Sequence, residues 1–230
     1  MISSSGSVEP DYFIMNSQLI VAITAFSTFV MGESNSLANF NEQALAQHEI
    51  SLENRQPDSW VNGIFKDNIL LNLAYLDGRV SKKEDIDWDE VRKPFTYQFR
   101  LNPGEAFAYH EDVLPEYKDK VVRTTNAHFN AADGFQSDGY LVGDGVCHLA
   151  SLIYWVAKDA GLDTQAPTNH DFAVIPDISK EYGVSIYNYP GRVEANARQN
   201  LYISNNKEKV ITFKFEYDGT NLKVSAVETN

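Results

Sequence analysis

The sequence predicts an α+β fold: a single mixed domain in which a buried helix, bearing the only cysteine, packs on antiparallel strands. Three observations predict it. A long apolar run over residues 147–160 is typical of a buried helix. Residues 95–101 alternate between apolar and polar side chains, which is a strand pattern. At the C-terminus, strand-like runs over 209–217 and 221–228 are joined by "DGTN", so we expect a C-terminal β-hairpin.

In the N-terminal half, residues 1–17 are expected to be a polar tail, and one domain is expected over 18–230. Residues 18–31, rich in Ile, Val, Thr and Phe, predict a buried strand. One helix is expected around 37–48 within a polar excursion. The apolar positions of 69–76 recur at helical spacing, and the glycine that follows them at position 78 marks the end of that helix.

In the C-terminal half, the strand over 95–101 is followed by a turn at 102–104, where Asn, Pro and Gly are consecutive. Residues 111–139 are polar and predict loops. Residues 140–142 are expected to form a short strand that leads into a glycine turn, and Gly161 ends the helix that follows.

Composition limits the functional classes. Of 230 residues, 43% are hydrophobic and 22% are charged, as in an ordinary globular protein, and the net charge of −13 argues against nucleic acid as a partner. One cysteine allows no internal disulfide and no cysteine-pair metal site, and we expect no metal or cofactor. The first residues lack a basic n-region, and polar residues interrupt 13–31, so we expect no signal peptide and no membrane span in this chain.

The cysteine has a chemically suggestive position. Cys147 lies at the start of the predicted helix, where free N–H groups and the helix dipole stabilise a thiolate and can later hold an oxyanion. Gly143 and Gly145 allow the sharp turn before it. The alternative is a buried free cysteine that acts as a small hydrophobe, and the charge of Asp144 favours that alternative.

A thiolate enzyme needs an imidazole within hydrogen-bond reach. His148 follows Cys147 directly, but on a helix it points about 100° away. His170 lies 23 residues further along, after a loop that contains proline, and a returning chain could bring it to the sulfur. The other histidines have weaker contexts, so Cys147 and His170 are the candidate pair.

The stretch "GDGVCHLASLIYWVAKDAGL" resembles the "GGGVCQ" helix of the VanW family. The segments "AFSTF", "NILLNLAYLDG", "NPGEAFAY", "NHDF" at the family's "HS" position, and "NLYISNNKEKVITFKFEYDGTNLKVSAVE" follow in the family's order. The resemblance covers roughly residues 20–228, with insertions near 33–58 and 80–94.

The resemblance implies a bacterial cell-wall-associated protein that works outside the membrane on peptidoglycan stem peptides. Some members are similar to cysteine L,D-transpeptidases, which implies that Cys147 is the nucleophile of a thioester mechanism and His170 its base. Gly145 and His148 would shape the turn and the oxyanion site. Glu105, in the matched "PGE", either supports the site loop, binds a substrate amine, or is a plain turn carboxylate. There are two alternatives: a cysteine hydrolase of wall peptides, and a peptidoglycan-binding module whose catalytic site has decayed.

The sequence also departs from the family pattern. Asp144 replaces the second glycine, and a like charge beside a thiolate raises its pKa. His148 replaces the glutamine after the cysteine. An acidic family position falls near Gly183, so orientation of the histidine would require Asp171 or Asp177 instead.

Overall fold

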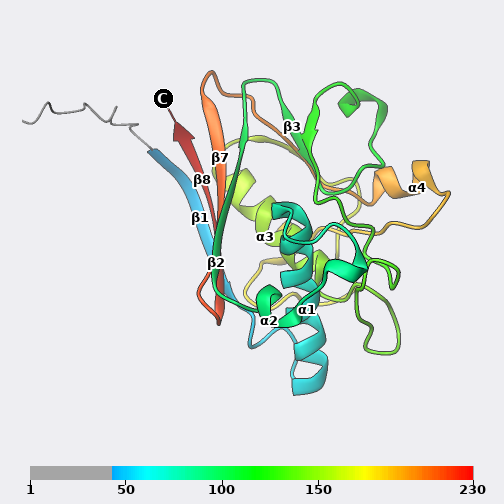
Figure 1. The fold of residues 1–230 in the computed structure, drawn as a ribbon. Coiled ribbons are helices and arrows are strands. Elements are labelled where there is room, and N and C mark those ends of the chain that lie inside the picture. The colour runs from blue at the N-terminus through cyan, green and yellow to red at the C-terminus, as the bar shows by residue number, and fades with distance from the viewer. Residues whose placement is uncertain (1–42, 230) are drawn as a thin grey trace, which may run out of the picture. The chain divides into compact units, whose positions relative to one another are not determined.

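The structure is a computed structural model and describes residues 43–229 (Figure 1). The predicted tail over 1–17 and the predicted strand over 18–31 lie outside the described residues. Two four-stranded sheets and two long helices build the fold, with strand orders β1-β8-β7-β2 and β4-β3-β6-β5. The predicted α+β class and C-terminal hairpin are confirmed.

The first sheet is antiparallel throughout. Its strands are β1 (Gln43–Ser51), β8 (Asn221–Thr229), β7 (Val210–Tyr217) and β2 (Phe95–Leu101). The turn between β7 and β8 is stabilised by Asp218, whose carboxylate accepts the backbone N–H groups of Thr220 and Asn221. Phe99 stacks on Phe213 and Phe215 on the inner face, so the alternating pattern in the sequence places one face of the sheet in the core.

The second sheet is smaller because its four strands are short. It contains β4 (Val121–Arg123), β3 (Ala106–Ala108), β6 (Tyr202–Ser204) and β5 (Asp163–Gln165). The β3–β4 pair is parallel, and the β3–β6 and β5–β6 pairs are antiparallel.

Two helices cover the inner face of the first sheet (Figure 1). The first, α1 (Ser59–Asp77), begins at Asp58, whose carboxylate accepts from the amides of residues 60 and 61, and ends at Gly78 in the left-handed conformation. The second, α3 (Val146–Asp159), packs between α1 and strands β1 and β8, and nine of its residues are buried. Helix α3 confirms the predicted position, whereas α1 contains the predicted positions 69–76 but begins ten residues earlier, at Ser59. The predicted glycines at 78 and 161 follow the two helices in the left-handed conformation.

The remaining helices are short. The charged stretch after α1 forms η1 (Lys83–Asp85) and α2 (Trp88–Val91) at the surface. The others are η2 (Pro115–Tyr117), η3 (Lys180–Tyr182) and α4 (Val193–Arg198). Within residues 43–229, no helix combines the length and the hydropathy needed to cross a membrane.

Two local predictions were wrong. The helix expected around 37–48 is, from residue 43, strand β1, because its backbone pairs with β8 along almost its whole length. His48 on this strand stacks on Trp155 of α3 at 3.5 Å between ring centroids and contacts Asp159 at 2.7 Å. Residues 140–142 form no strand; a single bridge joins Val142 to Ser137, and the segment is exposed.

Candidate functional site

A cavity of about 160 Å³ opens at the N-terminus of α3. Three residues with possible chemistry line it together: Cys147, His148 and His170. The rest of its wall comes from the glycine loop over 141–145, from residues 172–174 and from Gln56, Phe65, Ile186 and Tyr187. The structure therefore brings the candidate thiol and two imidazoles to one concave site, which is the usual form of a small-molecule site.

The glycine turn before α3 accepts no other residue type. Gly143 has φ of 88°, and a Cβ there would lie 2.8 Å from the carbonyl oxygen of Phe129. Gly145 has φ of 95°, and its Cβ would lie 2.6 Å from the carbonyl oxygen of Phe65. The left-handed backbone and the close approach both require glycine, so the turn fixes where α3 begins.

Asn68 on α1 holds the loop that carries these glycines. Its side-chain amide donates to the carbonyl oxygens of Gln136 (3.0 Å) and Asp144 (2.9 Å), and its oxygen accepts from the Gln136 amide at 2.8 Å. Asn68 is fully buried. Sequence reasoning missed this residue, although an asparagine inside the apolar stretch "NILLNLAYL" was a signal, because buried polar groups need partners.

The Cys147 sulfur contacts backbone rather than an imidazole. The amide of Ile186 donates to Sγ at 3.4 Å, and Sγ lies 3.7 Å from the Ile186 carbonyl oxygen. One turn later, Ser151 accepts from the amide of Val184 at 2.9 Å. The side chains at positions 147 and 151 thus anchor the segment 184–186 to α3, and neither His148 nor His170 hydrogen-bonds to the sulfur.

The electrostatics of the thiol oppose the sequence-based expectation. Burial raises the pKa of Cys147 to about 11, and the nearby carboxylate of Asp144 raises it further. Hydrogen bonds from the amides of Ile186 and of Cys147 itself lower the pKa, but the effect of burial is larger. Cys147 is half-buried and lines the open cavity. The helix N-terminus therefore does not produce a preformed thiolate, and the thiol is protonated at neutral pH.

His148 lies closer to the thiol's cavity than its sequence position suggested. Its ring is buried, 5.1 Å from the ring of Phe65 and 6.4 Å from that of His170. Burial lowers the pKa of His148 to about 3, with further contributions from the charges of Arg55 and His170. Among residues 43–229, no group hydrogen-bonds to its Nδ1, and its backbone N–H donates to the Gly145 carbonyl oxygen at 3.0 Å.

His170 lies on an irregular segment that crosses the cavity. It is buried, and its ring lies 4.0 Å from that of Phe172. Its Nδ1 has no hydrogen-bond partner in the part of the chain that the structure describes. Burial lowers its pKa, so this imidazole is neutral at pH 7. At Gly183 a Cβ would lie 2.6 Å from the His170 carbonyl oxygen, so the close packing leaves no room for an acidic side chain there.

Arg55 hydrogen-bonds to the segment that carries His170. This buried guanidinium donates to the Pro176 carbonyl oxygen at 3.0 Å and to Asp177 at 2.5 Å. Asp177 adopts a left-handed conformation with φ of 64°. Asp177 therefore pairs with Arg55 and not with an imidazole, and Arg55 is a second structural residue that sequence reasoning missed.

The other carboxylates have separate environments. Glu105 accepts from the backbone N–H (2.7 Å) and side-chain amide (3.0 Å) of Asn102, within the turn between β2 and β3, and it does not line the cavity. Asp144 lines the cavity, accepts from the Asp138 amide at 3.1 Å, and has its pKa raised by burial to about 6. Asp171 is exposed beside His170. Among the described residues, no group of three or more His, Cys, Asp and Glu side chains could share a metal ion.

Fold and site together define a protein class: an α+β domain with a thiol at the mouth of a helix-terminal cavity. A family model described as VanW like protein matches residues 97–227, from β2 to β8, including Cys147 and His170. The match covers more than half of the chain, and the chain belongs to the VanW-like family. This family suggests a cell-wall-associated role. Neither the curated proteins nor the solved structures contain a match to this chain.

Proposed function

We propose that this chain acts on peptidoglycan stem peptides outside the membrane, as a cysteine-dependent L,D-transpeptidase. The observation that carries the proposal is the shared cavity, where the Cys147 thiol and the His170 imidazole open to the same space at a helix N-terminus. Family membership supports the cell wall as the place of action.

The protonation states favour general-base catalysis over a preformed ion pair. The thiol is neutral because burial raises its pKa, and both imidazoles are neutral because burial lowers theirs. A neutral imidazole can accept the thiol proton as attack begins. With a pKa of about 3, His148 is too weak a base for that role, so the role falls to His170.

The proposed reaction has two acyl transfers. His170 accepts the Cys147 proton while Sγ attacks the carbonyl carbon of an L,D bond. The tetrahedral intermediate collapses, the proton passes to the departing amine of the terminal D-residue, and a thioester remains on Cys147. The amine of a second stem then attacks the thioester, His170 takes the amine's proton, and the sulfur leaves and is reprotonated. Hydrolysis follows the same path with water as the second nucleophile.

For attack to occur, substrate binding has to bring His170 to the sulfur, since they are not hydrogen-bonded in this structure. Catalytic hydrogen bonds often shorten only in the substrate complex. The segment between β5 and η3, which carries His170, is one of the parts of the cavity wall that lie outside helices and strands.

A second candidate function is a peptidoglycan-binding module without catalysis. Two observations favour it: burial and Asp144 raise the thiol pKa, and the Ile186 amide uses Sγ as an acceptor, which gives the cysteine a structural role.

Incubation with purified disaccharide-peptide fragments of the wall, followed by mass spectrometry, tests the proposal. Cross-linked dimers and a released D-residue, absent with Cys147→Ser and His170→Gln, are the expected result. His128→Gln is the matched control, because His128 pairs with Glu111 and Asp133 away from the cavity. Shortened stems without dimers would indicate the hydrolase, and binding without products would indicate the module. If the protein gives no products and does not bind the fragments, the proposal is overturned.

A further inference from the structure

A second cavity of about 240 Å³ adjoins the candidate site. Its walls come from Tyr187, Tyr189, Arg192 and three residues of the α4 region. Tyr187 also lines the thiol cavity, so the two cavities are neighbours on either side of this one side chain. The volume lies below the usual range for drug-sized ligands, which suits one small rigid unit.

The two tyrosines are an exposed aromatic pair. Tyr187 is 46% exposed and Tyr189 is 53% exposed, and their rings are 6.3 Å apart and parallel to within 16°. Exposed apolar surface that is contiguous and lies beside a cavity is a candidate binding surface. Tyrosine combines an apolar ring face with a hydroxyl group, the two features that the C–H faces and hydroxyl groups of a sugar require.

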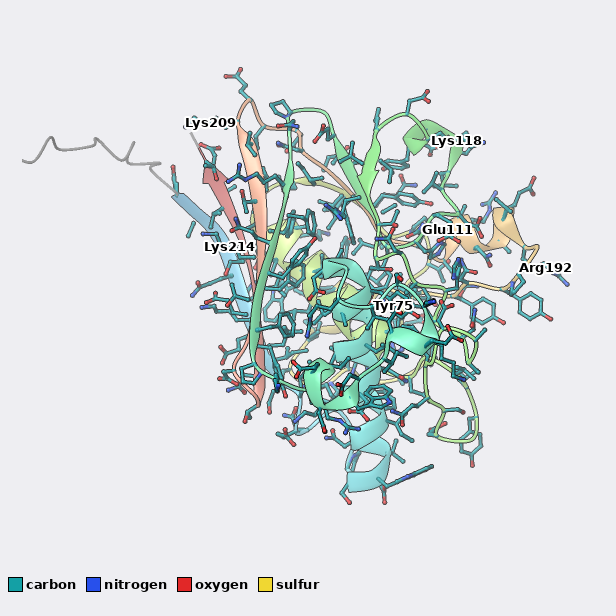
Figure 2. All side chains as sticks on the ribbon, in the orientation of Figure 1. Tyr75, Glu111, Lys118, Arg192, Lys209 and Lys214 are labelled. Carbon is teal, nitrogen blue, oxygen red and sulfur yellow. The ribbon has the colours of Figure 1, made fainter. Side chains whose placement is uncertain are left out.

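The remaining wall offers hydrogen-bond donors. Figure 2 shows Arg192 at the outer end of the α4 segment, away from the first sheet, and among the described residues its guanidinium has no partner. Its five N–H donors are available to hydroxyl and amide oxygens of a ligand.

The cavity is held in shape by backbone contacts. The buried side chain of Asn196 accepts from the Tyr189 amide at 3.0 Å and donates to the Tyr189 carbonyl oxygen at 2.9 Å. The same side-chain amide donates to Asp112 at 2.6 Å. The Tyr187 amide donates to the Gln199 carbonyl oxygen at 3.2 Å. The backbone at both tyrosines is thus fixed before any ligand binds, which lowers the entropic cost of binding.

We propose that this second cavity binds one amino-sugar unit of the wall glycan. The link to the stem peptide rests on the proposed function. Ile186 contacts the sulfur, and Tyr189 follows three positions later, so at most about 10 Å of chain separates Tyr189 from the residue at the sulfur. A stem of about three extended residues spans the same distance between its sugar and the carbonyl next to an L,D bond. A disaccharide-peptide can therefore place its carbonyl at Cys147 and its sugar between Tyr189 and Arg192.

Calorimetry on the whole chain with three ligands tests the proposal: the free stem peptide, the disaccharide-peptide and a chito-oligosaccharide. The wild-type protein should bind the disaccharide-peptide about tenfold more tightly than the free peptide, and the oligosaccharide should bind weakly on its own. Tyr189→Ala and Arg192→Ala should abolish that gain. Trp60→Ala, which removes an aromatic side chain that is 63% exposed and lines neither cavity, should retain it.

Equal affinity of the wild-type protein for the two peptide ligands would overturn the sugar site and leave the proposed function standing. Binding of the oligosaccharide, lost in Tyr189→Ala, with no binding of either peptide would support the sugar site and overturn the proposed function. A gain that survives in both variants would place the sugar elsewhere and overturn the assignment.

Discussion

The ionisation of Cys147 gives the sharpest quantitative prediction. Burial raises its pKa to about 11, whereas a free cysteine titrates near 8.5. At pH 8, about 0.1% of the Cys147 population is thiolate, against about a quarter of a free thiol. Because the thiolate is the reacting species, alkylation of the folded protein at pH 8 should be about 200 times slower than that of a model thiol.

The assay is the rate of iodoacetamide alkylation of Cys147 between pH 6 and 11, read by mass spectrometry. The rate should rise tenfold per pH unit through pH 10 without a plateau, and the same protein in denaturant should show the profile of a free thiol. A half-maximal rate at or below pH 8.5 in the folded protein would refute the argument from burial.

Asp144 provides a second test of the same electrostatics. Its carboxylate raises the pKa of Cys147, so Asp144→Asn should lower that pKa and increase alkylation at pH 8 by about threefold to tenfold. Asp171→Asn is the matched control, since Asp171 is exposed and does not contribute to the shift at Cys147. Equal rates for the two variants would contradict the role of Asp144.

Three further predictions concern stability, measured by urea unfolding. Gly145→Ala should lower the free energy of unfolding by about 3 kcal/mol, because the position combines a left-handed backbone with a Cβ 2.6 Å from a carbonyl oxygen. Gly78→Ala should lower it by about 1 kcal/mol, because Gly78 is left-handed but has open space around it. Equal losses for the two variants would contradict the packing argument. Asp177→Ala should lower the free energy of unfolding by about 3 kcal/mol, because it leaves the buried Arg55 guanidinium without its carboxylate. Arg55→Met, which removes the buried charge itself, should lower it less. The reverse order of the two variants would refute this reasoning. Burial lowers the pKa of His148 to about 3, so between pH 6.5 and 3 the unfolded state binds more protons and stability falls as pH falls. His148→Gln should make the free energy of unfolding fall less steeply as pH falls, by about 1.4 kcal/mol per pH unit. Parallel plots of the free energy of unfolding against pH for the variant and the wild type would contradict this prediction.

Local patterns predicted the elements that local interactions determine. The α3 helix and the helix ending at Gly78 follow from apolar spacing and a glycine stop, and β2 and the β7–β8 hairpin follow from alternation and turn chemistry. Strand β1 was missed because its partner β8 lies at the other end of the chain, and pairing at that distance outweighs the local preference.

The candidate site was predictable in its residues but not in its electrostatics. The sequence indicated Cys147 and His170, and they line one cavity. The thiol pKa depends on the segment around Ile186, which covers the sulfur and has no periodic pattern in the sequence. The Arg55–Asp177 pair joins residues 122 positions apart, and no local signal connects them.

Peptide mapping of a trapped acyl-enzyme tests the central claim most directly. The protein is mixed with the disaccharide-peptide, quenched in acid within seconds, digested, and the fragment that contains Cys147 is weighed. The account predicts a thioester on Cys147 equal in mass to the donor stem without its terminal D-residue, lost on treatment with hydroxylamine and absent in His170→Gln. An unmodified Cys147 in a reaction that nevertheless releases the D-residue would contradict it.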